Sequence, residues 1–376
     1  MRLKQIEFFR LQIQLCMPIK HHLAEHTYSE NLVVKVVTDS GVAGYGEGVA
    51  RQYVTGETTD ASLSFLRDYL IPRINGYGAT DPADLMQTFT DLVPSHERIQ
   101  APAACCALEL AIFDAAGKTW GLSLTDLLGG INQPFVYSAI IPMMDHASFQ
   151  RLLFLIRDQR MAFVKIKVGN NKDLEILSQV RQTLGEEVDL RVDANGAWSA
   201  EQAEERIAAM MVYGISAVEQ PVAKENFRGL KRVSESVPIP VIADESVCFE
   251  QDAKNLASQE ACQIFNLRLS KCGGILAAAR IYEIGRKKGI NAQLGCQVGE
   301  TGILAAAGRH LATSLELLYH EGSYASYLLE EDIVNEPVSF GLGGLAQPLA
   351  GHGLGVTVNE DALQRLAVLH EKISIL

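Results

Sequence analysis

Residues 162–171, AFVKIKVGNN, place Lys165 and Lys167 two positions apart in an otherwise apolar run. Side chains alternate along a β-strand, so both ammonium groups would share one face, and Val164, Ile166 and Val168 would occupy the other. Lysine is rarely buried without a partner, because loss of hydration disfavours the charged ammonium. Taken alone, the stretch fits a solvated strand face better than a functional site, so the neighbouring strands decide its meaning.

From about residue 134 onward, short β-rich runs alternate with amphipathic helical segments, most of which end at a glycine. The β-rich runs are FVYSAIIPM, FVKIKV, VDLRVDA, AVEQPV, PVIADES, QIFNLRLS, NAQLGC and ELLYHEG. Eight strands that each neighbour a helix predict a parallel α/β barrel, closed or nearly so. The last unit is weaker than the others, which favours a modified barrel.

The first 130 residues follow a different pattern. Residues 31–48, NLVVKVVTDSGVAGYGEG, predict two strands around an Asp-Ser-Gly turn, as in an antiparallel meander, and helical stretches follow. Residues 353–369, GLGVTVNEDALQRLAVL, predict a further strand and helix outside the barrel. We therefore expect an α+β capping domain over residues 1–130, completed by about 345–376, and a catalytic barrel over residues 131–344.

The composition limits the classes of function. A chain of 376 residues accommodates a barrel of about 250 residues and a smaller domain. The net charge of −12 argues against nucleic acid as a partner, because phosphate binding needs a basic surface. The seven cysteines show no CxxC spacing, and no apolar run reaches the roughly 18 residues of a membrane span. We expect a cytoplasmic protein that acts on a small molecule.

Three consecutive predicted strands end in acidic residues, namely Asp193, Glu219 and the pair Asp244–Glu245. The intervals are 219 − 193 = 26 and 244 − 219 = 25 residues, one strand–helix unit each. Because barrel active sites lie at the C-terminal strand ends, these carboxylates would converge, and they would repel one another unless a cation joined them. Mg²⁺ or Mn²⁺ fits such oxygen ligands best. Helix capping or loop charge explains one such acid better than three in phase.

The acid cluster gives the lysines a context. The strand with Lys165 and Lys167 immediately precedes the Asp193 strand, and LRLSKCGG (267–274) places Lys271 on the other flank. A base on each side of a metal-bound substrate could remove or deliver a proton at a carbon next to a carboxylate, while the metal stabilises the enolate. A nearby divalent cation favours the neutral amine, which can act as a base. The paired lysines are therefore predicted to be catalytic.

These motifs together resemble the enolase superfamily, and within it the muconate lactonizing enzyme subgroup, over nearly the whole chain. KIK, DAN, EQP, ADES and SKCGG come in family order and spacing, and ALELAIFDAAGKTWG (107–121) resembles the helix that joins cap and barrel. The resemblance implies an α+β cap over a modified (β/α)₇β barrel (a modified TIM barrel), commonly a homo-oligomer.

The resemblance also implies the roles of the site residues. The ligands of Mg²⁺ or Mn²⁺ would be Asp193, Glu219 and Asp244. Lys167 and Lys271 would form the acid–base pair on opposite faces of a small carboxylic-acid substrate. Lys165 would tune Lys167 electrostatically, and Asn195 would support the site from behind.

Specificity in this family comes from two cap loops, which would be CMPIKHHLAEHT (16–27) and GVARQYVTGET (48–58). Candidate groups there for a second substrate carboxylate are Lys20, His21, His22, Arg51 and Tyr53. For the histidines, ordinary loop surface is an equally good interpretation.

The last barrel units carry one match and one departure. Glu321, in YHEGSYASYLLEEDIV (319–334), matches an acidic residue of muconate cycloisomerases, and the Asp-x-Asp pair of many dipeptide epimerases is absent. LGCQVGETGILAAAG (294–308) differs from the Glu-Ser-containing segment usual in the subgroup. Gln297, a candidate substrate contact, and Glu300 are unexpected there and would alter selectivity.

Several reactions fit these residues. The leading hypothesis is a cycloisomerase acting on cis,cis-muconate or a substituted muconate, with Lys167 handling the proton. An N-acyl amino acid racemase or dipeptide epimerase would need both Lys167 and Lys271 as bases. An acid dehydratase or an o-succinylbenzoate synthase is possible on the same scaffold. Two alternatives come from other classes. A Schiff-base aldolase could use a lysine in a barrel strand, but it would not need three acids at equivalent strand ends. A barrel without catalytic activity would have no need to keep all three predicted metal ligands and both lysines.

Overall fold

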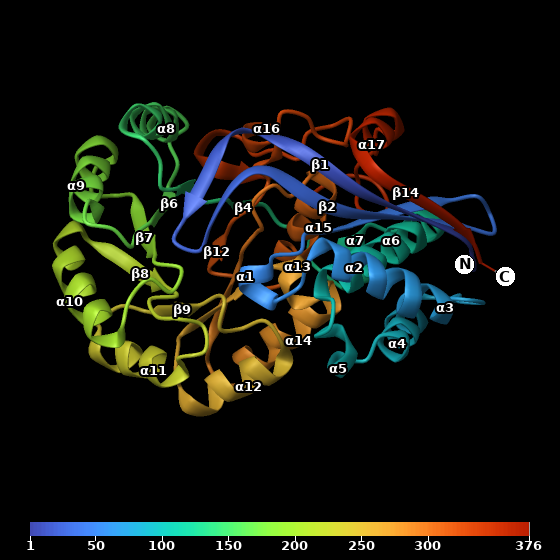
Figure 1. The fold of residues 1–376 in the computed structure, drawn as a ribbon, viewed down its shortest axis with the longest axis horizontal. Coiled ribbons are helices and arrows are strands. Elements are labelled where there is room, and N and C mark those ends of the chain that lie inside the picture. Colours follow the sequence, from blue (N-terminus) through green and yellow to red (C-terminus); the bar gives the residue numbers. More distant parts are fainter. Residues whose placement is uncertain (376) are drawn as a thin grey trace.

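The computed structural model describes residues 1–375 as an antiparallel sheet set against an eight-stranded parallel sheet, with a small two-stranded sheet beside them. Figure 1 shows the strand–helix units from α8 to α14 as a curved wall, with the blue N-terminal strands lying across its open side. The α/β barrel with an N-terminal capping domain, predicted from the sequence, is confirmed. Within residues 1–375 no helix is long and apolar enough to cross a membrane.

The capping sheet joins the two ends of the chain. It has the order β14-β1-β2-β3 and is antiparallel throughout, and its strands are β1 (Leu3–His21), β2 (Ala24–Thr38), β3 (Ala43–Gly48) and β14 (Ala367–Ser374). Helix α17 (Glu360–Leu366) leads into β14. The strand predicted before this helix is wrong: the described residues 353–358 make only isolated bridges, and the strand follows the helix instead.

Helix α6 (Pro102–Trp120) lies directly against β3, and three glycines make this approach possible. A Cβ atom at Gly44, Gly46 or Gly48 would lie only 2.0–2.2 Å from a helix carbonyl oxygen. Those oxygens, four residues apart along α6, belong to Ala111, Ala107 and Ala103. Any side chain in this row would push the helix off the sheet, so the glycines fix the element that leads from cap to barrel.

Shorter elements complete the cap and its junction with the barrel. They are α1 (Gln52–Thr55), α2 (Thr59–Phe65), a π-helical turn (Leu66–Leu70), α3 (Ile71–Arg73), α4 (Pro82–Leu92), α5 (Ser95–Arg98), α7 (Leu124–Leu127) and the small sheet of β4 (Phe135–Val136) and β13 (Leu345–Ala346). Arg98 and Glu109 form a buried ion pair at 2.7 Å within this region. Arg98 also donates to the carbonyl of Gly273, and Glu109 accepts the N–H of Leu276, so the pair ties the cap to the barrel.

The barrel sheet is parallel from edge to edge. Its strands are β5 (Ala139–Ile141), β6 (Phe163–Lys167), β7 (Asp189–Asp193), β8 (Ile215–Glu219), β9 (Val241–Ala243), β10 (Ile264–Leu267), β11 (Asn291–Leu294) and β12 (Tyr319–His320). The two edge strands meet where the N–H of Ser138 donates to the carbonyl of His320 at 2.8 Å. The two-residue β12 agrees with the weak last unit of the sequence pattern.

Helices alternate with these strands along the chain. They are α8 (His146–Asp158), α9 (Asp173–Leu184), α10 (Ala200–Met210) with a 3₁₀ turn (Met211–Tyr213), α11 (Phe227–Ser236), α12 (Glu250–Gln259), α13 (Leu269–Cys272), α14 (Ile275–Arg286), α15 (Gly302–Ala312), α16 (Ala325–Leu328) and a 3₁₀ turn (Leu342–Gly344). Val164 and Ile166 on β6 are buried, as the alternation predicted for the face opposite the lysines.

Strand register places the site residues in a row. Lys167 on β6 pairs with Asp193 on β7, which pairs with Glu219 on β8. Asp244 follows two residues after Ile242, the β9 residue that pairs with Glu219. The in-phase acids of the sequence therefore lie side by side at the C-terminal ends of adjacent strands.

Candidate active site

Lys165 is a fixed cation at the centre of the barrel mouth. Its Nζ lies 2.6 Å from Glu321 Oε2 and 3.1 Å from Glu219 Oε2, and the carboxylate of Asp193 is 3.4 Å away. Burial disfavours its charged form, but these carboxylates outweigh that cost and raise the pKa of Lys165. The residue therefore stays protonated and neutralises the acids around it, rather than acting as a base.

Lys167 faces the cavity above this cluster. Its Nζ donates to Asp193 Oδ2 at 2.6 Å and to Asn195 Oδ1 at 2.9 Å. An ammonium has three donors, so Lys167 keeps the capacity for one further hydrogen bond, to a substrate. Asn195 in turn donates to Glu245 Oε1 at 3.0 Å, which orients the amide that holds Lys167.

The three predicted metal ligands are fully buried. Glu219 accepts hydrogen bonds from Asn266 and Gln293 at 2.8 Å each, and despite its burial, Lys165 and Lys167 hold its pKa below the usual range. Side-chain cations separate the acids as they stand, and within residues 1–375 no group of three His, Cys, Asp or Glu side chains has the spacing to hold a metal ion. The metal site therefore stays a prediction.

The donor set nevertheless fits a hard divalent cation. Buried carboxylate oxygens from adjacent strands are the ligands that Mg²⁺ and Mn²⁺ prefer. Glu245, next to Asp244, has a buried Oε2 with no hydrogen-bond partner among the described residues. Burial, followed by the charge of Asp193, raises the pKa of Glu245.

The structure corrects the expected position of Lys271. Its Nζ donates to the carbonyl oxygens of Asp244 at 2.7 Å and Asn266 at 2.8 Å and to Asp244 Oδ1 at 3.0 Å, which uses all three donors. It is fully buried in α13 and is not among the described residues that line the cavity. Lys271 lies in the turn of helix that follows β10, and its Nζ reaches back to the carbonyl of Asn266 within that strand.

Arg268 takes the place predicted for Lys271. It follows directly after β10, lines the cavity and contacts the carboxylate of Asp244. It also donates to Gln297 Oε1 at 3.2 Å. Strand β10 is four strands from β6 in the eight-stranded sheet, so Arg268 and Lys167 lie on opposite sides of the barrel mouth. The signal for Arg268 was its position one residue beyond the strand, in NLRLS.

The cap contributes some of the predicted residues and not others. Lys20 and Tyr53 line the cavity, together with His21. The exposed His22 and the buried Arg51 are not among the described residues that line it, so their predicted substrate contacts are not supported. His21 is the last residue of β1 and is buried, whereas His22 lies in the turn that follows and is exposed. Burial and the charge of Lys167 lower the pKa of His21 to about 2, so its ring is neutral.

Arg51 has a structural role instead. Its guanidinium donates to the carbonyl of Ala50 at 2.9 Å and to the carbonyl of Val298. Val298 lies in the segment after β11, so Arg51 fastens the cap loop to the barrel.

In the same segment Glu300 lines the cavity and accepts the N–H of Gln297 at 2.6 Å, and burial raises the pKa of Glu300 to about 8. Gln297 and Glu300, the two unexpected residues of this segment, thus both line the cavity.

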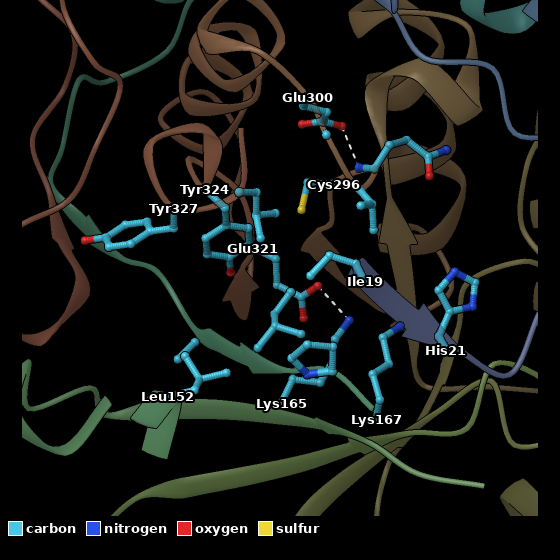
Figure 2. Close-up of a pocket in the computed structure, with 18 of the residues that line it drawn as sticks. Ile19, His21, Leu152, Lys165, Lys167, Cys296, Glu300, Glu321, Tyr324 and Tyr327 are labelled. Carbon is cyan, nitrogen blue, oxygen red and sulfur yellow. Dashed lines mark hydrogen bonds and ion pairs between the residues drawn. The ribbon is translucent and has the colours of Figure 1, made fainter. Parts of the chain in front are cut away.

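The cavity has a volume of about 330 Å³ and lies between the tip of the β1–β2 hairpin and the barrel mouth. Figure 2 shows Lys165, Lys167 and His21 on one side and Leu152 and Tyr327 on the other. Charged groups therefore gather at one end, and an apolar wall extends from it.

A parallel barrel with a cap sheet, and with lysines opposed to carboxylates at its strand ends, has the groups that proton transfer at a substrate in the barrel mouth requires. Residues 150–362 match the family described as enolase C-terminal domain-like, and residues 6–129 match the mandelate racemase / muconate lactonizing enzyme N-terminal domain. The chain belongs to the enolase superfamily, in its muconate lactonizing enzyme subgroup.

Relatives with different reactions are similar to this chain. Muconate cycloisomerase 1 of Pseudomonas putida is 31% identical over 363 residues, covering 92% of this chain and 93% of the relative. The dipeptide epimerase of Enterococcus faecalis V583, solved with Mg and the dipeptide L-Leu-L-Tyr, is 30% identical with a TM-score of 0.85, covering 95% and 100%. The N-succinyl Arg/Lys racemase structure from Bacillus cereus has a TM-score of 0.90 at 25% identity, covering 99% and 100%.

Proposed function

We propose that this enzyme transfers a proton at the carbon next to a substrate carboxylate, with Lys167 as its single acid–base residue. The observation that carries the proposal is the difference between the three lysines that line the cavity. Lys165 is bound by three carboxylates, and Lys20 lies at the rim, 61% exposed and paired with Glu25. Lys167 alone among the three is held inside the site by hydrogen bonds, to Asp193 and Asn195, and still keeps one donor for a substrate.

The proposed metal is Mg²⁺, which would be held by Asp193, Glu219 and Asp244. Their burial and oxygen donors support this, and the Enterococcus faecalis epimerase was solved with Mg. When bound, the ion supplies positive charge that stabilises an enolate. The chain's own residues do the rest: Lys167 moves the proton, and Lys165 keeps Asp193 and Glu219 ionised.

The opposite side of the mouth favours one of the candidate reactions. Racemisation or epimerisation by two bases needs a group on each face of the carbon that can both take and give a proton. Arg268 occupies that side, and a guanidinium holds its proton under all ordinary conditions. We therefore favour a reaction on one face, as in a cycloisomerase: Lys167 delivers a proton to the enolate carbon, and Arg268 provides a fixed positive charge.

Epimerisation is the second candidate, because the dipeptide epimerase is as similar as the cycloisomerase. In this chain it would need a proton donor other than a lysine on the Arg268 side. A one-base dehydratase or an o-succinylbenzoate synthase would use Lys167 as the cycloisomerase does, and would be recognised by its product.

Proton NMR in D₂O with MgCl₂ tests the proposal, with cis,cis-muconate, N-acyl amino acids and dipeptides as substrates. We expect either a lactone with one deuterium or α-proton exchange with retained configuration. Exchange with inversion in the wild-type enzyme would refute the one-face mechanism. Absence of any exchange or product across the panel would refute the function itself.

The variant Arg268→Lys supplies a second ammonium on the opposite side. We expect it to gain inversion at the α-carbon of an amino-acid substrate that the parent only exchanges. Lys20→Ala, which changes a lysine at the cavity rim, is the matched control and should keep the parent's stereochemistry.

A further inference from the structure

Glu300 differs from the other carboxyl groups of the cavity in having almost no partner. Its Oε1 accepts the N–H of Gln297 at 2.6 Å, and within residues 1–375 no cation lies within 4.0 Å of either carboxyl oxygen. Glu321, in the same cavity, has Lys165 at 2.6 Å and Arg191 at 3.5 Å. A carboxylate that is removed from water needs such compensation, and Glu300 lacks it.

The backbone on both sides of Glu300 is held by the capping domain. Asn31 on β2 donates to the carbonyl of Gly299 at 2.8 Å. Glu47 on β3 accepts the N–H of Thr301 at 2.9 Å. Glu300 therefore cannot shift toward a cation without breaking these buried contacts, and its carboxyl group stays directed at the cavity.

Charged groups on the neighbouring elements act on Glu300 in opposite directions. Burial has the largest influence and raises the pKa of Glu300 to about 8; Glu47 also raises it, and Arg268 and Arg51 lower it. Both guanidinium groups are engaged elsewhere. Arg268 contacts the Asp244 carboxylate, and Arg51 donates to two backbone carbonyls.

The remaining titratable neighbours are uncharged or already paired. Burial raises the pKa values of the Cys106 and Cys296 thiols, which stay neutral, and Glu321 is paired within the barrel. Glu300 is thus a neutral carboxylic acid at pH 7. Because its Oε1 accepts the N–H of Gln297, Oε2 carries the proton and can donate it in a hydrogen bond.

We propose that Glu300 determines specificity as a neutral hydrogen-bond donor to an oxygen at the end of the substrate that lies away from Lys167. Figure 2 places Glu300 and Lys167 on opposite sides of the residues that it draws. The complementary group is an uncharged oxygen acceptor, such as the carbonyl of an ester or a lactone.

The inference rests on the proposed function, which places the reacting carboxylate at the Lys167 end. It adds no second proton transfer at the α-carbon, so the reaction on one face is kept. Lactone formation turns a carboxylate into an ester carbonyl, and a neutral donor can hydrogen-bond to the group in both forms.

Isothermal titration calorimetry with MgCl₂ present tests the proposal with three probes: monomethyl adipate, octanoate and 6-aminohexanoate. Each carries one carboxylate, and the far ends are an ester, a hydrocarbon and an ammonium group. At pH 7, Glu300→Met should weaken monomethyl adipate about 2- to 10-fold relative to octanoate, because one hydrogen bond is lost. Glu300→Gln, whose amide still donates, should keep the parent's ratio of affinities.

Glu316→Met is the control, because Glu316 is exposed and not among the described residues that line the cavity. It should keep the parent's ratio. An equal ratio in the parent and Glu300→Met would overturn the proposal, and so would a failure of the parent to bind monomethyl adipate. A preference of the parent for 6-aminohexanoate that Glu300→Gln removes would also overturn it, because an ionised Glu300 would then be binding a cation.

The pH dependence is a readout that a purely structural role would not change. Glu300 loses its proton between pH 7 and 9, so the affinity for monomethyl adipate relative to octanoate should fall over this interval in the parent. The same ratio should stay constant in Glu300→Gln. A parallel fall in both proteins would assign the pH dependence to another group and contradict the proposal.

The outcomes separate this inference from the proposed function. Discrimination between the probes through Glu300, without deuterium exchange or product from any substrate of the NMR panel, would support the Glu300 site and refute the function. Turnover of a panel substrate, with probe affinities that do not respond to changes at Glu300, would support the function and refute the Glu300 site.

Discussion

Replacing Lys167 with alanine should abolish proton transfer while leaving the fold intact. Lys167 makes two hydrogen bonds, to Asp193 and Asn195. Without it, Asp193 keeps Lys165 at 3.4 Å and the backbone N–H of Asn195 at 3.0 Å, so no buried charge is left without a partner. We therefore expect the free energy of unfolding to fall by only about 1–3 kcal/mol.

The effect on rate should be much larger. A positioned acid–base side chain contributes about 10²–10⁴-fold, which corresponds to roughly 3–5 kcal/mol of activation free energy. The assay is the rate of deuterium incorporation or of product formation, followed by NMR with saturating MgCl₂, alongside urea unfolding of the same variant. Lys20→Ala, which changes another lysine lining the cavity, should stay within about threefold of the parent.

Two results would contradict this reasoning. A loss of less than tenfold in Lys167→Ala would mean that another group moves the proton. An equal loss in Lys20→Ala would mean that general positive charge in the cavity, not a positioned base, is what the reaction needs.

Three further predictions concern stability. Arg98→Met should lower the free energy of unfolding by about 3–5 kcal/mol in urea, because it leaves the buried Glu109 carboxylate unpaired, and Arg98→Met/Glu109→Leu should recover part of it. Gly46→Ala should lower the melting temperature, because its Cβ would lie 2.1 Å from a helix carbonyl oxygen, whereas Gly341→Ala meets nothing closer than 3.7 Å. Burial raises the pKa of Glu300 from 4.5 to about 8, so the folded chain binds this proton more tightly than the unfolded chain. The stability that this proton contributes is complete below about pH 4.5 and is lost as the pH rises to 8. Glu300→Gln should therefore gain urea resistance over the parent across that interval.

Each of these predictions has a clear contrary result. If Arg98→Met/Glu109→Leu were no more stable than Arg98→Met, the stability lost in Arg98→Met would not come from the unpaired Glu109 carboxylate. Equal melting shifts for Gly46→Ala and Gly341→Ala would exclude the close approach of β3 and α6 as the cause. A stability difference between Glu300→Gln and the parent that is independent of pH would mean that Glu300 is ionised in the folded chain.

Much of the site could be predicted because a parallel barrel repeats itself. Each strand–helix unit ends at the same edge of the sheet, so acids at intervals of 26 and 25 residues must lie side by side. Strand alternation likewise turned Lys165 and Lys167 to one face. These are local rules of spacing and period, and they held for β6 to β9.

The rules stopped where the strands end. Beyond β10 the chain enters α13, so Lys271 leaves the row that alternation would predict and is buried under Asp244, while Arg268 faces the cavity. In the cap, the end of β1 separates two histidines: His21 is its last residue and lines the cavity, whereas His22 lies in the turn beyond it. The resemblance of SKCGG to its family motif does not tell whether Lys271 or Arg268 faces the cavity. The direction of a side chain after a strand depends on the turn that follows.

The sequence by itself determined the barrel, the row of carboxylates and the paired lysines, because periodicity and unit length are written in neighbouring residues. Only the tertiary structure decided what shares the cavity with them. Arg268 faces Lys167 with three strands between β10 and β6, and the cavity is lined both by α8 and by Tyr327 and Phe340, more than 160 positions further along the chain. Such contacts depend on how the closed barrel and its cap bring distant segments together, which no local pattern specifies.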